Sequence, residues 1–231
     1  MGPDREKFLN RIKNSLRHSL LPAASAEHPG PFQGYTFQPD APVETMVEDF
    51  ARELRALSGH VHILEDAEGV VPVILEILQG HQAKQIIAWD GADLGLPWLR
   101  GALTEAGITM VDSHIAADAD GRKANLSALD GIQVGLTGAQ GGLADTGTLA
   151  LVSGPGRGRL ASLLPPVHIA VLSAQKLYPS LPTFLAANPT AATEGSNLVF
   201  ITGPSRTADI ELTLSMGVHG PKEIHVIITQ S

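Results

Sequence analysis

Apolar residues recur along the chain with two different spacings, which predict helices and strands in alternation. Apolar residues three or four positions apart predict helices at residues 4–20, 43–57, 67–78, 97–105, 123–129, 160–164 and 181–187. Short apolar runs, many of them β-branched, predict buried strands at residues 61–64, 85–89, 108–111, 132–137, 149–153, 168–172, 198–201 and 224–229. This alternation is typical of parallel βαβ units with right-handed crossovers. The sequence therefore predicts an α/β fold with an open, mostly parallel sheet flanked by helices.

Residues 1–42 are expected to form an arm outside this fold. Residues 22–42 are rich in proline, glycine, alanine and serine and show no periodicity, which predicts a loop or a flexible connection. The helix before them, residues 4–20, is basic and amphipathic. It either binds an acidic partner or a membrane surface, or packs on its own domain or on a second subunit. The predicted division is an N-terminal helix and loop arm at 1–42 and one α/β domain at 43–231, and a homo-oligomer is left open.

The composition excludes several classes of protein. The chain has 231 residues, 43% of them hydrophobic, as in a globular protein, and its formal net charge of −8 argues against a general nucleic-acid binder. It contains no cysteine, so it forms no disulfide, offers no thiolate nucleophile and gives an iron–sulfur cluster no cysteine ligand. No apolar run has the length of a membrane span, and the N-terminus lacks the apolar core of a signal peptide. We therefore expect a cytoplasmic protein without a membrane span.

The most informative stretch is residues 197–221, in which an apolar strand runs into a polar turn after a Gly-Pro pair. The candidate anion-binding residues of this turn are Gly203, Ser205, Arg206, Thr207 and Asp209. Serine, threonine and aspartate cap helix N-termini, so we expect a helix from this turn to Met216. Free backbone N–H groups at such a start bind anions, and an arginine adds a forked cationic clamp. Alternatively, these residues only cap the helix and pair with surface charges, and the apolar–polar alternation of residues 209–216 also fits a strand.

A second polar stretch, TGAQGGLADTGT at residues 137–148, forms a loop between two predicted strands. Glycines such as Gly141 and Gly147 let a backbone approach a ligand closely or adopt positive φ angles. Asp145, Thr146 and Thr148 supply a carboxylate and two hydroxyl groups. Loops held by rigid elements often carry functional sites, so we interpret this loop as part of a binding site, with an ordinary turn as the alternative.

Two other patterns are interpreted as structural. His60 and His62 lie two apart on a predicted strand and hence on one face, but no third ligand stands at metal-binding spacing nearby. We therefore predict a solvated pair and no metal site. No G-x-G-x-x-G follows the first strand, which leaves dinucleotide binding unsupported. The glycines of GPGRG at residues 154–158 fit a tight turn, from which Arg157 and Arg159 can reach an anion.

The segments GPSRTADIE and GVHGP, together with TGAQGGLADTGT, closely resemble motifs of the LUD-domain family of lactate-utilisation proteins. The family pattern places an acidic residue, frequently glutamate, before a Thr/Ser-Gly-Thr/Ser run, and here that residue is Asp145. The resemblance implies a fold similar to that of the ribose-5-phosphate isomerase, glucosamine-6-phosphate deaminase and CoA-transferase group. Enzymes of that group bind ligands on loops at the carboxyl ends of a parallel sheet. Residues 137–148 and the segment from Gly203 onward both follow apolar strands, so we expect them to meet over one crevice at the carboxyl ends of the sheet.

The resemblance also suggests roles for individual residues. Asp145 and His219 are the candidate acid–base groups, and Arg206 with the hydroxyls of Ser205 and Thr207 would hold a small anionic substrate. His219 is equally well explained as a loop histidine that bonds a backbone carbonyl.

The implied function is that of a subunit of an L-lactate oxidation system, which converts lactate to pyruvate with iron–sulfur partner proteins. The clusters would sit only on those partners, and this chain would bind substrate or cofactor, or assemble the complex. Binding of a nucleotide or CoA, and activity of the chain alone, are left open. Two alternatives remain: a free-standing isomerase or CoA-transferase-like enzyme acting on a phosphorylated or CoA-linked substrate, and a module that binds a small carboxylate.

Overall fold

The computed structural model describes residues 3–18, 41–113, 115–208, 214–217 and 219–230. The chain divides into two units, Met1–Thr36 and Phe37–Ser231. The first unit contains helix α1 (Pro3–His18), on which the apolar side chains of Phe8, Leu9 and Ile12 are exposed. Every other helix and strand of the described residues belongs to the second unit.

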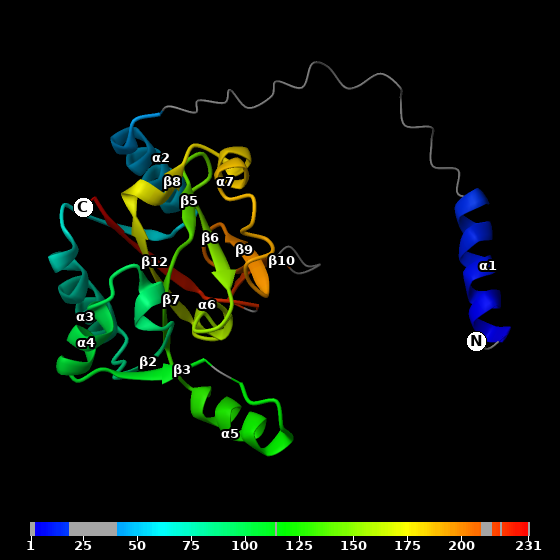
Figure 1. Ribbon diagram of the computed structural model, residues 1–231, viewed down its shortest axis with the longest axis horizontal. Helices are drawn as coiled ribbons and strands as arrows, with labels where there is room; N and C mark the ends of the chain where they lie inside the picture. Colours follow the sequence, from blue (N-terminus) through cyan, green and yellow to red (C-terminus); the bar gives the residue numbers. More distant parts are fainter. Residues whose placement is uncertain (1–2, 19–40, 114, 209–213, 218, 231) are drawn as a thin grey trace. The chain divides into compact units, whose positions relative to one another are not determined.

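Six parallel strands form the central sheet of the second unit (Figure 1). In spatial order they are β1 (His60–Leu64), β12 (Glu223–Thr229), β7 (Val167–Ser173), β4 (Val134–Gly138), β2 (Gln85–Ala88) and β3 (Thr109–Asp112). Three of the four inner strands, β12, β7 and β4, consist almost entirely of buried residues, as expected for parallel strands that are covered on both faces. The prediction of an open, mostly parallel α/β sheet is confirmed.

Helices and short 3-10 turns connect the strands. They are α2 (Val43–Ala56), η1 (Ala67–Gly69), α3 (Val70–Gly80), η2 (Gly91–Leu94), α4 (Leu99–Glu105), α5 (Ala119–Leu129), α6 (Leu160–Leu163), η3 (Ala174–Lys176) and α7 (Leu181–Ala187). Some of them pack against the sheet backbone itself. A Cβ atom at Gly135 of β4 would lie 1.8 Å from the Ala161 carbonyl oxygen, so only glycine lets α6 approach this strand. No described helix is long and apolar enough to span a bilayer.

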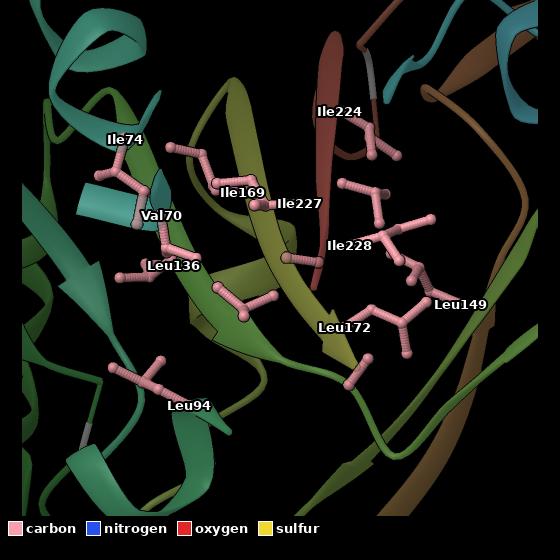
Figure 2. Close-up of a cluster of buried hydrophobic side chains, with 14 of the residues drawn as sticks. Val70, Ile74, Leu94, Leu136, Leu149, Ile169, Leu172, Ile224, Ile227 and Ile228 are labelled. Atoms are coloured by element: carbon pink, nitrogen blue, oxygen red, sulfur yellow. The ribbon is translucent and has the colours of Figure 1, made fainter. Parts of the chain in front are cut away.

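Different elements cover the two faces of the central sheet (Figure 2). On one face, Val70 and Ile74 of α3 lie beside Leu136 of β4. On the other face, Leu149 of strand β6 (Thr148–Ser153) lies beside Leu172 of β7. All five side chains are fully buried in one continuous hydrophobic core, so the sheet is the middle layer of three.

The second face is covered in part by a smaller sheet, in which β6 is an inner strand. Its order is β8 (Leu177–Tyr178), β5 (Gly141–Leu143), β6 and β9 (Asn197–Ile201), and β6 is antiparallel to both β5 and β9. The prediction that residues 137–148 form one continuous loop is wrong, because β5 lies inside it. Glycine generally weakens a strand, but in β5 close packing against neighbouring side chains requires it. A Cβ atom at Gly141 would lie only 2.9 Å from the Phe184 ring.

The prediction of a helix between Ser205 and Met216 is also wrong. Strands β10 (Arg206–Ala208) and β11 (Leu214–Met216) pair in an antiparallel ladder, with Arg206 opposite Met216. The alternation of apolar and polar residues therefore predicted this segment better than its capping residue types did. Asp209, one of the candidate anion-binding residues, lies outside the described residues.

Candidate functional site

The two polar stretches meet at a row of three hydroxyl groups, which we call the threonine row: Thr146, Thr148 and Thr202. The Oγ1 atoms of Thr146 and Thr148 are 2.8 Å apart, and those of Thr148 and Thr202 are 2.7 Å apart. The Thr146 hydroxyl donates to Asp145 Oδ1 at 3.2 Å. Because each hydroxyl has a single proton to donate, Thr148 must donate to Thr146 and Thr202 to Thr148. The row therefore runs from the end of β9 to a carboxylate in the β5–β6 turn.

The surroundings of Asp145 shift the pKa of its carboxyl in the direction that an acid–base role requires. Its carboxyl is partly buried, and this burial raises its pKa above the usual value for aspartate. The hydrogen bond from Thr146 opposes the shift, and the charge of Glu53 on α2 adds to it. A raised pKa brings proton exchange closer to neutral pH, which is what general acid–base chemistry needs. The acid–base role of Asp145 fits this setting and stays a prediction.

The glycines of both stretches contact the protein itself. Gly147 has φ +61°, and a Cβ atom there would lie 2.4 Å from the Leu54 nitrogen of α2. Gly203 has φ +83°, and its Cβ atom would lie 3.0 Å from that of Leu57. Gly141 meets Phe184, as described above. Packing therefore accounts for these three glycines, and their contact with a ligand stays a prediction.

Arg206 is bound to the C-terminal end of α2. Its exposed guanidinium donates to the Leu57 carbonyl and, at 3.1 Å, to the Ser58 hydroxyl. A cation at this position complements the partial negative charge of the helix C-terminus. The described residues of this turn form strand β10 and no helix start, and the Ser205 N–H donates to the Pro221 carbonyl at 2.8 Å. Arg206 remains a candidate anion ligand through its other N–H groups.

Replacing Arg206 with alanine is expected to lower the free energy of unfolding by about 1 kcal/mol, because the α2 C-terminus loses its charged hydrogen-bond donor. Chemical denaturation with urea measures this loss. Arg206→Lys keeps the charge at the helix end and serves as the matched control, with a smaller expected loss. An unchanged stability of Arg206→Ala would show that the two bonds to α2 contribute nothing to folding.

Asp145, the threonine row and Arg206 lie at the amino ends of the parallel strands; we call this region the α2-end site. Arg206 contacts Leu57 and Ser58, directly before β1, and Ser205 bonds Pro221, directly before β12. The expectation that the two blocks meet at the carboxyl ends is therefore wrong. The reason is the β5–β6 hairpin, which carries the Asp145 turn back to the end of α2.

The other predicted residues are placed around the α2-end site. His219 is exposed in the loop before β12, and this loop lies beside Ser205, whose carbonyl accepts from the Gly217 N–H at 2.9 Å. Thr207 lies in β10, opposite Ser215. Among the described residues no hydrogen bond joins His219 to Asp145, so their joint acid–base role stays a prediction.

A separate cavity of about 330 Å³ lies at the carboxyl ends of β2 and β3. Asp90, Asp112 and Arg159 line it together with the GPGRG segment. Gly154 and Arg157 pair through their backbones, which confirms the predicted tight turn, and the Arg157 Nε atom is 3.7 Å from Asp93 Oδ1. Of the two arginines expected to reach an anion, Arg159 is the one that lines the cavity.

The sequence pattern of the LUD domain matches residues 47–229. The chain belongs to the LUD domain family. It is 32% identical to a protein named lactate utilization protein C from Geobacillus sp. (strain WCH70), in an alignment that covers 98% of this chain and 96% of that protein. It is 28% identical to a protein of the same name from Halalkalibacterium halodurans, covering 98% and 97% of the two chains. The family resemblance predicted from the motifs is thus confirmed.

The fold also matches that of a solved structure. The crystal structure of a DUF162 family protein from Deinococcus radiodurans superposes with a TM-score of 0.59 and covers 82% of this chain and 99% of its own. The two sequences are 20% identical, so this likeness supports the LUD-type α/β fold alone.

Proposed function

We propose that the chain is a component of a lactate-utilisation system. The supporting observation is that relatives named lactate utilization protein C align with nearly the whole chain. In this proposal the system oxidises L-lactate to pyruvate together with iron–sulfur partner proteins. The chain binds the small anionic substrate or assembles the complex and is not itself the redox centre. Its lack of cysteine supports this division of roles, because iron–sulfur clusters are normally held by cysteine thiolates.

The α2-end site can bind and deprotonate a 2-hydroxy acid. Oxidation of lactate to pyruvate removes two electrons and two protons, one proton from the hydroxyl group and one from the carbon that carries it. The partners would supply the electron acceptor. The Asp145 carboxylate can take the hydroxyl proton, since burial raises its pKa and the Thr146 hydroxyl fixes its orientation. The N–H groups of Arg206 that do not bond α2 can hold the substrate carboxylate. Gly147, two residues after Asp145, packs against Leu54 of α2, and Arg206 bonds Leu57 directly after the same helix.

Deleting the gene for this chain is expected to abolish growth on L-lactate as sole carbon source, while growth on pyruvate continues. Complementation with Asp145→Asn should lower lactate consumption by about 100-fold, because the amide accepts the Thr146 hydrogen bond but takes no proton. Asp120→Asn, which changes an exposed carboxylate on α5, is the matched control and should restore wild-type growth. Normal growth of the deletion strain, with no paralogue present, would contradict the assignment to lactate utilisation.

The carboxyl-end cavity supports a second candidate function, that of a free-standing enzyme acting on a phosphorylated or CoA-linked substrate. Its position follows the general rule for ligands in open α/β sheets, and Arg159 can bind an anionic group there. Turnover by the purified chain separates the candidates. If the lactate proposal is right, the purified chain does not oxidise lactate with artificial electron acceptors until the iron–sulfur partners are added. The second candidate expects turnover of its own substrate by the pure chain, and a loss of that activity in Arg159→Ala.

A further inference from the structure

Four histidines and a glutamate gather where β1 and β12 begin. His60 and His62 belong to β1, Glu223 and His225 to β12, and His81 follows α3. The strand register pairs His60 with His225, so these side chains lie on the same face of the sheet. The two rings stack, with centroids 4.5 Å apart and planes inclined by 15°. His62 and His225, 163 positions apart in the sequence, also become direct neighbours.

Four of these side chains bring donor atoms to one place. The ligand atoms of His60, Glu223 and His225 all lie within 4.8 Å of one another. Glu223 Oε1 is 2.7 Å from His225 Nε2 and 3.8 Å from His60 Nε2, and Glu223 Oε2 is 3.4 Å from His81 Nε2. Ligands of a tetrahedral zinc ion, with bonds of about 2.0–2.1 Å, lie roughly 3.3 Å apart. The distances from Glu223 to the three histidines bracket this value, and side-chain rotations would bring the histidines themselves closer together around an ion.

We propose that His60, His81, Glu223 and His225 form a binding site for a divalent transition metal ion, and that Zn²⁺ is the ion that fits it. Three imidazole nitrogens and one carboxylate oxygen match the donors and the coordination number that zinc prefers. The side chains of His60 and His81 are 54% and 30% exposed, so an ion can enter from solvent. The prediction of no metal site depended on a missing third ligand, and the fold brings in three further donors.

His62 has the position of a supporting residue. Its Nε2 atom is 3.1 Å from His225 Nδ1, and its ring lies 5.4 Å from that of His225. If His225 binds the metal through Nε2, its Nδ1 carries the ring proton, and this N–H group donates a hydrogen bond to His62 Nε2. Such an outer hydrogen bond fixes the ring and its tautomer.

The zinc site goes beyond the proposed function, and its ligands are distinct from Asp145, the threonine row and Arg206. It links the starts of two parallel strands to the turn that follows α3. The competing explanation is a set of solvated histidines around one carboxylate. That explanation predicts weak binding without defined stoichiometry, which a titration can distinguish from a built site.

The test is a titration of the full chain, without a histidine tag and after removal of metals with EDTA. Isothermal titration calorimetry with Zn²⁺ should show one site per chain, and Co²⁺ should give the intense visible absorption of tetrahedral coordination. His60→Asn and His81→Asn should each weaken Zn²⁺ binding by at least about 100-fold, and His62→Asn by about 10-fold. The circular dichroism of His60→Asn and His81→Asn should stay that of the wild type, since both side chains reach the surface. Asp120→Asn removes an exposed carboxylate on α5 and should leave binding unchanged.

Two results would overturn the proposal. One is the absence of stoichiometric Zn²⁺ binding by the wild-type chain. The other is equal binding by the His60→Asn, His81→Asn double variant, which would place the ion elsewhere on the surface. Neither result bears on the lactate proposal, which growth experiments test separately.

Discussion

Alanine at Gly147 is expected to lower the free energy of unfolding by about 3 kcal/mol or more. Gly147 has φ +61°, a left-handed conformation that costs a residue with a Cβ atom about 1 kcal/mol or more. The added methyl group would lie 2.4 Å from the Leu54 nitrogen and 2.8 Å from its Cα atom. These are backbone atoms of α2 and cannot rotate away, so the turn itself must move, and such overpacking costs roughly 1–3 kcal/mol.

Urea denaturation of the Gly147→Ala variant measures this loss of stability, with the separate Gly101→Ala variant as the control. Gly101 lies inside α4 with open space around its Cβ position, so alanine there should raise stability by about 0.5–1 kcal/mol. If Gly147→Ala loses less than about 1 kcal/mol, the turn shifts easily and α2 does not hold Asp145 in place.

His168 is expected to make the protein sensitive to acid. It is fully buried in β7, and this burial lowers its pKa to about 4, whereas an unfolded chain has a histidine pKa near about 6.5. Between these values the unfolded chain takes up a proton that the folded chain does not, so protonation favours unfolding. Stability therefore falls as the pH drops from about 6.5 to about 4, by about 3 kcal/mol. The Nε2 atom contacts the Thr137 hydroxyl at 2.9 Å, and Nδ1 finds no hydrogen-bond partner among the described residues.

Comparison of the wild type with His168→Gln isolates this contribution. Glutamine can keep a hydrogen bond to Thr137 but does not titrate, so the variant should lose about 3 kcal/mol less stability over the same pH range. Urea denaturation at several pH values, with EDTA present, gives the difference directly. His225 titrates in the same range in both proteins and cancels. Parallel stability–pH curves for the two proteins would show that His168 is not the acid-sensitive group.

The sequence predicts the central sheet well, because each of its strands is a short apolar run next to a helix with clear periodicity. It fails at β5 and at β10–β11 for a physical reason. Strand β5 contains two glycines, which have little preference for strands. They occupy it because Phe184 and α2 leave no room for larger side chains there. In β10 and β11, helix-capping residue types follow a Gly-Pro break, and pairing between the strands overrides local preference.

The candidate site was predicted in part. Asp145, Thr146 and Thr148 stand in one short motif, and they do lie together. Thr202 joins them only through the pairing of β6 with β9, which no local pattern reveals. The same holds for His225 beside His60, since the register of β1 against β12 is a long-range property. A third and fourth metal ligand cannot be found by searching the sequence near the first two.

Strand β6 sets the distance between the two candidate sites. Thr148, at its start, belongs to the threonine row, and Gly154, directly after its end, lines the carboxyl-end cavity. Six residues of extended chain span about 20 Å. A molecule as small as lactate can occupy only one of the two sites at a time. Chemistry that uses both therefore needs either two ligands bound at once or one elongated substrate that reaches along the strand.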